Sequence, residues 1–182
     1  MLFVAGTRPE GIKLIPVYQA FLKAGIPALF CATLQHYELL KQVLDIFRVE
    51  PDFSLDIMKE AQDLFYVTSA VLERPKEVYL KTKPSAVFVH GDTTTTMASA
   101  LAAFYLDIPV AHVEAGLRTG NMRAPFPEEM NRKVVGQIGT FHFAPTAFST
   151  ANLISEGVPR ERVFCTGNTV VDALYIIRDK ID

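Results

Sequence analysis

Residues 86–118 read AVFVHGDTTTTMASALAAFYLDIPVAHVEAGLR, and this stretch decides the fold. Its two short apolar runs, residues 86–89 and 110–113, are typical of strands buried in a parallel sheet. The segment between them, residues 94–105, has the length of a helix. Its apolar residues at four-residue spacing, which we expect to face the sheet as one stripe, are Met97, Leu101 and Tyr105. A strand, a helix and a second strand in this order predict an α/β fold.

The same alternation runs through the whole chain. Further strands are expected at residues 2–5, 28–33, 141–144 and 163–166, with a weaker one at 53–57. Further helices are expected at residues 10–24, 37–47, 64–81, 128–137, 147–155 and 169–179. The pattern predicts a Rossmann-like, doubly wound parallel sheet, with residues 1–182 forming a single domain.

Composition narrows the class of protein. The chain has 182 residues, of which 49% are hydrophobic, and a net charge of −2, which is typical of a globular protein. Its 18 basic residues are scattered, so we expect neither a nucleic acid nor a membrane as partner. No basic leader precedes the first strand and no apolar run is long enough to span a membrane, so we expect a cytoplasmic protein. Cys31 and Cys165 fall in apolar runs and are expected to be buried thiols.

Three carboxylates stand at the ends of expected elements. Asp92 and Glu114 each follow a strand, and Glu128 begins a helix. Because ligands of parallel sheets bind beyond the carboxyl ends of the strands, we expect the three to converge on one cleft suited to acid/base chemistry. Glu128 is favoured over Glu129 because it shares a helix face with Arg132.

Each of these carboxylates also has a purely structural interpretation. Asp92 can cap the helix that follows it, and Glu114 can form an ion pair with Arg118. A glutamate in the first turn of a helix, such as Glu128, is favoured by the helix dipole alone.

Two turns carry further polar groups. Residues 6–13, GTRPEGIK, place a glycine and a helix N-terminus beside Arg8 and Lys13, which suits an anion, although the turn can equally be a capped helix start with Arg8 in solvent. The four threonines at 93–96 are poor helix formers and are expected to line the cleft, or else to fill the first turn of a helix. His90 fits a buried core histidine.

Several motifs occur in an order that resembles the non-hydrolysing UDP-N-acetylglucosamine 2-epimerases. They are GTRPEGIK, QH at 35–36, HGDTTTT, HVEAGLRTG, PFPEEMNR, FHFAPT and GNTVVDAL. The resemblance implies an isomerase that interconverts UDP-N-acetylglucosamine and UDP-N-acetylmannosamine for bacterial surface polysaccharides. It also implies two α/β domains in the GT-B arrangement, with the active site between them.

The resemblance also implies roles for individual residues. The implied catalytic residues are Asp92, Glu114, Glu128 and Arg132. The implied substrate-binding residues are Arg8, Lys13, Gln35, His36, Thr93 and Arg118. The reaction of the family removes the C2 proton and expels UDP to give 2-acetamidoglucal, then adds UDP back with protonation on the other face. It needs a base, an acid and a stabiliser of the diphosphate, and no cofactor or metal.

The chain departs from the family in length and at a few positions. It is about half as long as a family member, so residues 1–182 are expected to be the N-terminal domain, ending in the crossover between domains. A UDP-binding C-terminal domain, in cis or in trans, and a homo-oligomer are expected partners, and the chain alone is expected to be weak or inactive. Tyr37 stands where arginine is common, which affects a regulatory site of some members. The alternatives are a non-catalytic binding or assembly module and a 2-epimerase for another UDP-2-acetamido sugar.

Overall fold

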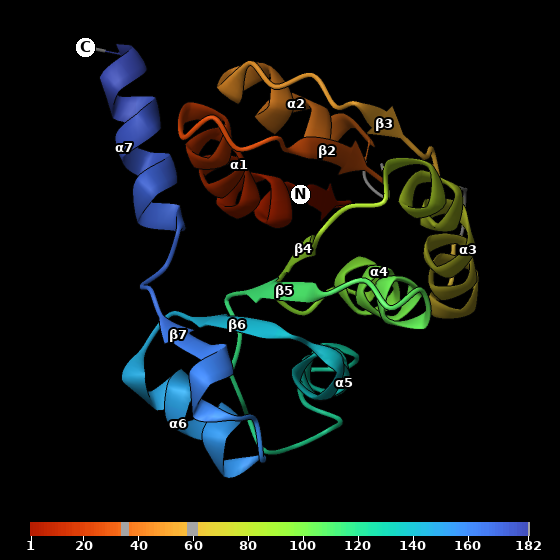
Figure 1. Cartoon of the computed structure of the whole chain (residues 1–182), viewed down its shortest axis with the longest axis vertical. Helices are drawn as coiled ribbons and strands as arrows, with labels where there is room; N and C mark the ends of the chain where they lie inside the picture. The colour runs from red at the N-terminus through yellow and green to blue at the C-terminus, as the bar shows by residue number, and fades with distance from the viewer. Residues whose placement is uncertain (34–36, 58–61, 182) are drawn as a thin grey trace.

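The fold is a seven-stranded sheet, seen in a computed structural model that describes residues 1–33, 37–57 and 62–181 (Figure 1). All strand pairs are parallel, and the strand order is β3-β2-β1-β4-β5-β6-β7. The strands are β1 (Leu2–Ala5), β2 (Leu29–Ala32), β3 (Phe53–Ser54), β4 (Val87–His90), β5 (Val110–Val113), β6 (Phe141–Ala144) and β7 (Val163–Cys165). Every residue of β1, β4 and β5 is buried, because helices cover both faces of the sheet there.

Helices form the two outer layers. They are α1 (Arg8–Lys23), α2 (Tyr37–Phe47), α3 (Leu64–Thr82), α4 (Thr94–Tyr105), α5 (Glu128–Ile138), α6 (Ala147–Ser155) and α7 (Val170–Ile181), with a short 3₁₀ turn at Arg160–Arg162. Helices α1, α2 and α7 pack on one face of the sheet, and α3, α4 and α5 pack on the other (Figure 1). The expected doubly wound parallel fold is therefore confirmed.

Aromatic rings fill the face under α1. Phe3 stacks on Phe88 at 4.6 Å between ring centroids, and the rings of Phe88 on β4 and Phe143 on β6 are 6.2 Å apart across β5. Tyr18 of α1 meets Phe3 edge to face. Such pairs add stabilisation beyond their buried area. They fix the stacking of α1 on β1 and β4, two of the strands that carry candidate residues.

The expected elements agree with the structure except in detail. The strand expected at 53–57 shortens to Phe53–Ser54. The stripe expected on α4 is wrong at Tyr105, which is 67% exposed. Helix α4 packs between α3 and α5, and its small residues, not its bulky ones, form most of these contacts. Cys165 is exposed, contrary to expectation, whereas Cys31 is buried.

Candidate active site

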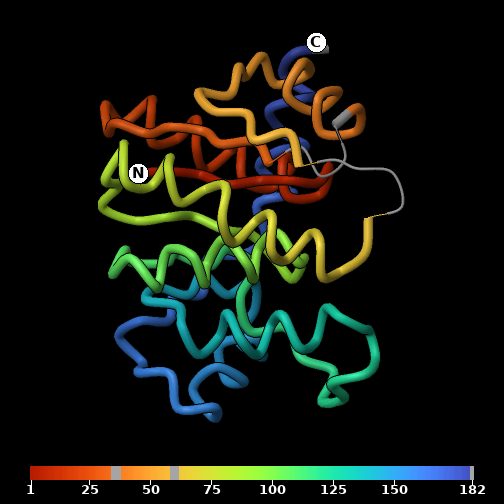
Figure 2. Tube along the Cα trace, turned by 90° about the vertical axis from the view of Figure 1, so that its right-hand side faces the viewer, coloured from red at the N-terminus to blue at the C-terminus, as the bar shows by residue number. Residues whose placement is uncertain are grey.

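Three turns at the carboxyl ends of adjacent strands carry the candidate residues. Strands β1, β4 and β5 lie side by side, and the chain leaves them at Gly6, Gly91 and Glu114. Figure 2 shows β1 (red) running from the N-terminus toward the side where the loop after β5 and the start of α3 project. Gly91 has a φ of 71° and Glu114 a φ of 62°. A left-handed glutamate is strained by roughly 1–3 kcal/mol, and such strain clusters at functional sites.

The Glu114 carboxylate has neighbours from three other parts of the chain, two of which donate hydrogen bonds to it. Lys13 Nζ on α1 lies 2.5 Å from Oε2, and Asn168 Nδ2, just before α7, donates to the same oxygen at 2.6 Å. His90 Nε2, at the end of β4, is 3.7 Å from Oε1. The ion pair with Arg118 that the sequence allowed does not form.

These neighbours control the charge of Glu114. Burial raises the pKa of the Glu114 carboxyl, but His90 and Lys13 lower it more strongly, and the net result is a pKa of about 2. Glu114 is therefore an ionised carboxylate at neutral pH. It can accept a proton or stabilise a positive charge, but it holds no proton to donate in the resting site.

Asp92 is held through its backbone and its side chain. His112 Nε2 lies 2.7 Å from the main-chain oxygen of Gly91, and Asn131 Nδ2 donates to the main-chain oxygen of Asp92 at 2.8 Å. Arg132 Nη2 lies 2.5 Å from Oδ2 of the Asp92 side chain. Burial lowers the pKa of His112 to about 3, so its ring is neutral and Nε2–H must be the donor to the carbonyl. The structural alternative for Asp92, a cap of the following helix, is wrong, because Thr93 caps α4.

The pairing and burial of Glu128 and Glu129 differ from the expectation. Arg132 pairs with Glu129, at 3.2 Å, and with Asp92, so the expected Glu128–Arg132 pair is wrong. The reason is burial: Glu129 is fully buried and also accepts the Gly120 amide at 3.1 Å, which turns it inward. Glu128 instead lines a small cavity of about 250 Å³ together with Asp92, and it forms no hydrogen bond or ion pair within the described part of the chain.

The expected anion site at the first turn is already filled by a side chain of the protein. Glu10 is fully buried, and its Oε2 accepts the amides of Gly6 and Thr7, both at 2.7 Å. Its Oε1 accepts the hydroxyls of Thr93 and Thr96, the latter at 3.0 Å. These two hydroxyls connect the start of α4 to the start of α1, while Thr93 and Thr94 also line the cavity beside Asp92, as expected for the threonines. Glu10 supplies the acceptor that a bound anion would otherwise provide.

The residues predicted to bind substrate do not all lie at the site. Lys13 joins the site, and Arg8 is exposed beside it in the first turn of α1. Arg118 lies apart, because Glu156, which directly follows α6, binds its guanidinium at 2.7 Å, and its expected role in substrate binding stays a prediction. Gln35 and His36 lie outside the described residues.

Sequence reasoning missed several residues that shape the site. Glu10, His112 and Asn131 act through backbone groups of the turns, and Asn168 contacts Glu114 directly. The one signal for Asn168 was a Gly-Asn-Thr turn placed before a helix. In residues 1–33, 37–57 and 62–181, no cluster of three or more His, Cys, Asp or Glu side chains is arranged to hold a metal ion.

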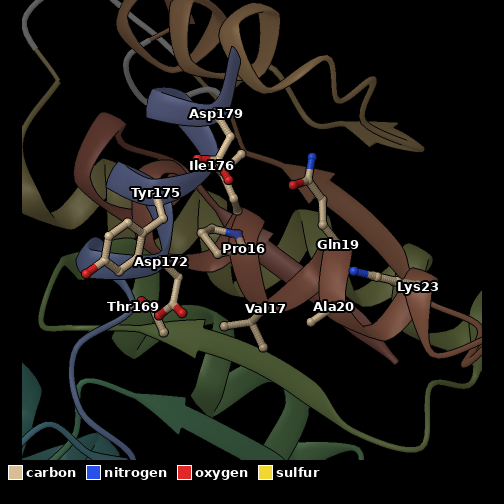
Figure 3. A pocket seen from close by; sticks show the side chains of 10 residues that line it. All are labelled: Pro16, Val17, Gln19, Ala20, Lys23, Thr169, Asp172, Tyr175, Ile176 and Asp179. Atoms are coloured by element: carbon tan, nitrogen blue, oxygen red, sulfur yellow. The ribbon is translucent and has the colours of Figure 1, made fainter. Parts of the chain in front are cut away.

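A larger cavity lies away from the carboxylates. It has a volume of about 540 Å³ and separates α1 from α7 (Figure 3). Its lining includes Pro16 and Val17 of α1 and Tyr175 and Ile176 of α7 (Figure 3). It contains none of the candidate catalytic residues, and the smaller cavity beside Asp92 and Glu128 is the one that fits the chemistry.

Comparisons with known proteins place the chain in a family. Residues 22–182 match the family described as UDP-N-acetylglucosamine 2-epimerase. A UDP-N-acetylglucosamine 2-epimerase of Salmonella typhimurium is 51% identical over all of this chain and 48% of its own length. A crystal structure of UDP-GlcNAc 2-epimerase from Neisseria meningitidis, bound to UDP-GlcNAc, is 48% identical with a TM-score of 0.94, covering 99% of this chain and 50% of that one.

A more distant likeness concerns the fold alone. MurG of Acinetobacter baumannii is 15% identical with a TM-score of 0.63, over 93% of this chain and 45% of that one. The expected likeness to the N-terminal half of a GT-B fold is thereby confirmed.

The length of the chain can be set beside that of its relatives, and its helices can be compared with the length of a membrane span. The chain spans about half the length of the curated relatives it matches. No helix within the described ranges has the length and apolar character needed to cross a bilayer. The matched residues and the high identity over the full chain show that it belongs to the UDP-N-acetylglucosamine 2-epimerase family.

Proposed function

We propose that this chain supplies the acid/base face of a UDP-N-acetylglucosamine 2-epimerase. The observation that carries the proposal is the set of carboxylates at the ends of β4 and β5, with Glu114 bound by Lys13 and Asp92 bound by Arg132. Family membership and the UDP-GlcNAc bound to the Neisseria relative support a nucleotide sugar as substrate.

The different surroundings of the carboxylates suggest a division of roles. In the elimination step, the C2–H bond breaks, its electrons form the C1=C2 double bond of 2-acetamidoglucal, and the C1–O bond breaks as UDP leaves. A carboxylate must accept the C2 proton, and a group on the other face must return one when UDP adds back. Glu114 is ionised and Glu128 is unpaired within the described chain, so these two are the proposed proton-transfer residues. Asp92, fixed by Arg132, is the proposed electrostatic partner.

The departing diphosphate needs positive charge. Lys13 is bound to Glu114, whereas Arg8 is exposed and has no ion pair with any described residue. Arg8 is therefore the proposed contact of the diphosphate.

The groups that hold the uridine are proposed to lie outside residues 1–182. A C-terminal UDP-binding domain, in cis or in trans, is proposed to hold the uridine and to exclude water from the cleft. The homo-oligomer and the cytoplasmic location stay predictions.

A deuterium exchange experiment tests the proposed chemistry. The chain is incubated with UDP-GlcNAc in D₂O, alone and with the C-terminal half of the Salmonella relative, and C2 deuterium and UDP-N-acetylmannosamine are measured by NMR. We expect exchange and epimerisation with the added half and little without it. Exchange should be lost in Glu114→Gln and Glu128→Gln but kept in the exposed control Glu77→Gln. Failure of the unchanged chain to exchange or to bind UDP-GlcNAc under either condition would contradict the proposal.

One observation favours the non-catalytic module as a second candidate. The outer side of α7 exposes Val171, Leu174 and Tyr175, which are 49%, 65% and 51% exposed. Neighbouring exposed apolar side chains are typical of contact surfaces. Sedimentation at several concentrations and UDP-GlcNAc titration separate the candidates, since a module should associate without binding the nucleotide sugar. Titration with other UDP-2-acetamido sugars tests the remaining substrate alternative.

A further inference from the structure

The turn between β7 and α7 brings two consecutive polar residues back to the candidate site. Asn168 Nδ2 donates to Glu114 Oε2 at 2.6 Å, and Thr169 Oγ1 donates to the main-chain oxygen of Lys13 at 2.7 Å. Lys13 and Glu114 are themselves an ion pair. One turn therefore contacts both members of the pair, from 54 and 156 residues away in the sequence.

The Asn168 side chain is fixed at both of its polar atoms. Its Oδ1 accepts the Val170 amide at 3.1 Å, which orients the amide group at the start of α7. With the oxygen used in this way, the NH₂ group is directed at Glu114. Lys13 and Asn168 then share Oε2, and Oε1 is left on the side of His90.

Helix α7 docks on the same face of the sheet as α1. Ala173 is buried in the core under α1, Ile177 packs partly buried against it, and Ile176 lies beside the open cavity (Figure 3). The polar turn at 168–169 adds hydrogen bonds from the beginning of α7 to the apolar contacts of its middle.

We propose that Asn168 is a positioning residue, whose amide holds the Glu114 carboxylate in the orientation needed for proton transfer and links that orientation to the docking of α7 on α1. The catalytic meaning of this role rests on the proposed function. The contact itself can be tested without turnover, through the behaviour of Glu114.

Variants can separate this role from simple support of α7. The charged or titratable groups that face Glu114 are Lys13 from α1 and His90 from β4, and neither is changed. Asn168→Ser can still accept the Val170 amide but is too short to reach Glu114. Asn168→Asp keeps that cap and places a carboxylate against Glu114. Ile176→Ala, the matched control, loosens α7 without touching the ion pair.

The experiment is a ¹³C NMR pH titration of the full chain with labelled glutamate side chains, with ¹H–¹⁵N spectra checking that each variant folds. We expect the Glu114 midpoint to move up by about one pH unit in Asn168→Ser, because a hydrogen bond to the ionised form is lost. It should move further in Asn168→Asp and stay in place in Ile176→Ala. An unchanged midpoint in both folded Asn168 variants would overturn the proposal, as would an equal shift in Ile176→Ala. Titration of the unchanged chain with UDP-GlcNAc tests the proposed function separately, so the two ideas can fail independently.

Discussion

Glu10 should be a main determinant of stability even though it is an acid with no basic partner. Its carboxylate accepts the buried amide of Gly6, the partly buried amide of Thr7 and hydroxyls of the α4 turn. Replacing Glu10 by leucine keeps the volume but leaves these donors without an acceptor. A buried unsatisfied amide costs roughly 1–3 kcal/mol, and the hydroxyls can rotate to other acceptors, so we expect a loss of about 3–5 kcal/mol in the free energy of unfolding. Glu10→Gln keeps one carbonyl acceptor and should lose about 1–2 kcal/mol.

Urea unfolding followed by circular dichroism measures both variants. Glu77→Leu, an exposed glutamate on α3, is the matched control and should change stability by less than about 0.5 kcal/mol. If Glu10→Leu behaves like Glu77→Leu, the donors at the start of α1 do not depend on the carboxylate and the reasoning is refuted.

Three further variants test other parts of the structure. Because the pKa of Glu114 in the folded chain is about 2 against an ordinary 4.5, its ionisation stabilises the fold above pH 4.5, and this contribution is lost as pH falls toward 2. In urea unfolding at several pH values, the difference in free energy of unfolding between the unchanged chain and Glu114→Gln should therefore shrink by about 2–3 kcal/mol from pH 4.5 to pH 2. Gly116→Ala should lower the melting temperature far more than Gly120→Ala, since both have positive φ but only the first would press a Cβ to 2.2 Å from a main-chain oxygen of α6. Arg118→Met should lose about 1–3 kcal/mol, because Glu156 loses the guanidinium and keeps only its pair with Lys133; UDP-GlcNAc affinity should be unchanged in calorimetry, and lost affinity at unchanged stability would instead support the predicted role of Arg118 in substrate binding.

The fold could be predicted from the sequence because its signals are local. Each of the three central strands β1, β4 and β5 is a run of four buried residues, and these runs stand out against the helical segments between them. The error at Tyr105 has a physical cause. Counting bulky residues identifies the buried side of a helix only when one side is buried, and α4 is enclosed by the sheet, α3 and α5, where alanine and threonine fit best.

The carboxylates of the site could be placed from the sequence, but their partners could not. A residue that follows a strand lies at the carboxyl end of the sheet whatever the strand order, so Asp92 and Glu114 were expected there. Lys13 is 101 residues from Glu114, and Arg132 is 40 residues from Asp92. Such contacts depend on the order of the strands and on the layer each helix joins, and local patterns do not encode either.

The choice between Glu128 and Glu129 shows why partners matter for chemistry. Helix spacing allows Arg132 to meet either residue, because positions three and four apart both share a face. Burial decides: the amide of Gly120 needs an acceptor in the interior, and Glu129 supplies it while Arg132 balances its charge. That structural pairing leaves Glu128 unpaired at the cavity beside Asp92. The pairing with Arg132 on which the choice of Glu128 rested is wrong, and the proposed role of Glu128 in proton transfer rests instead on its position at the cavity without a partner among the described residues.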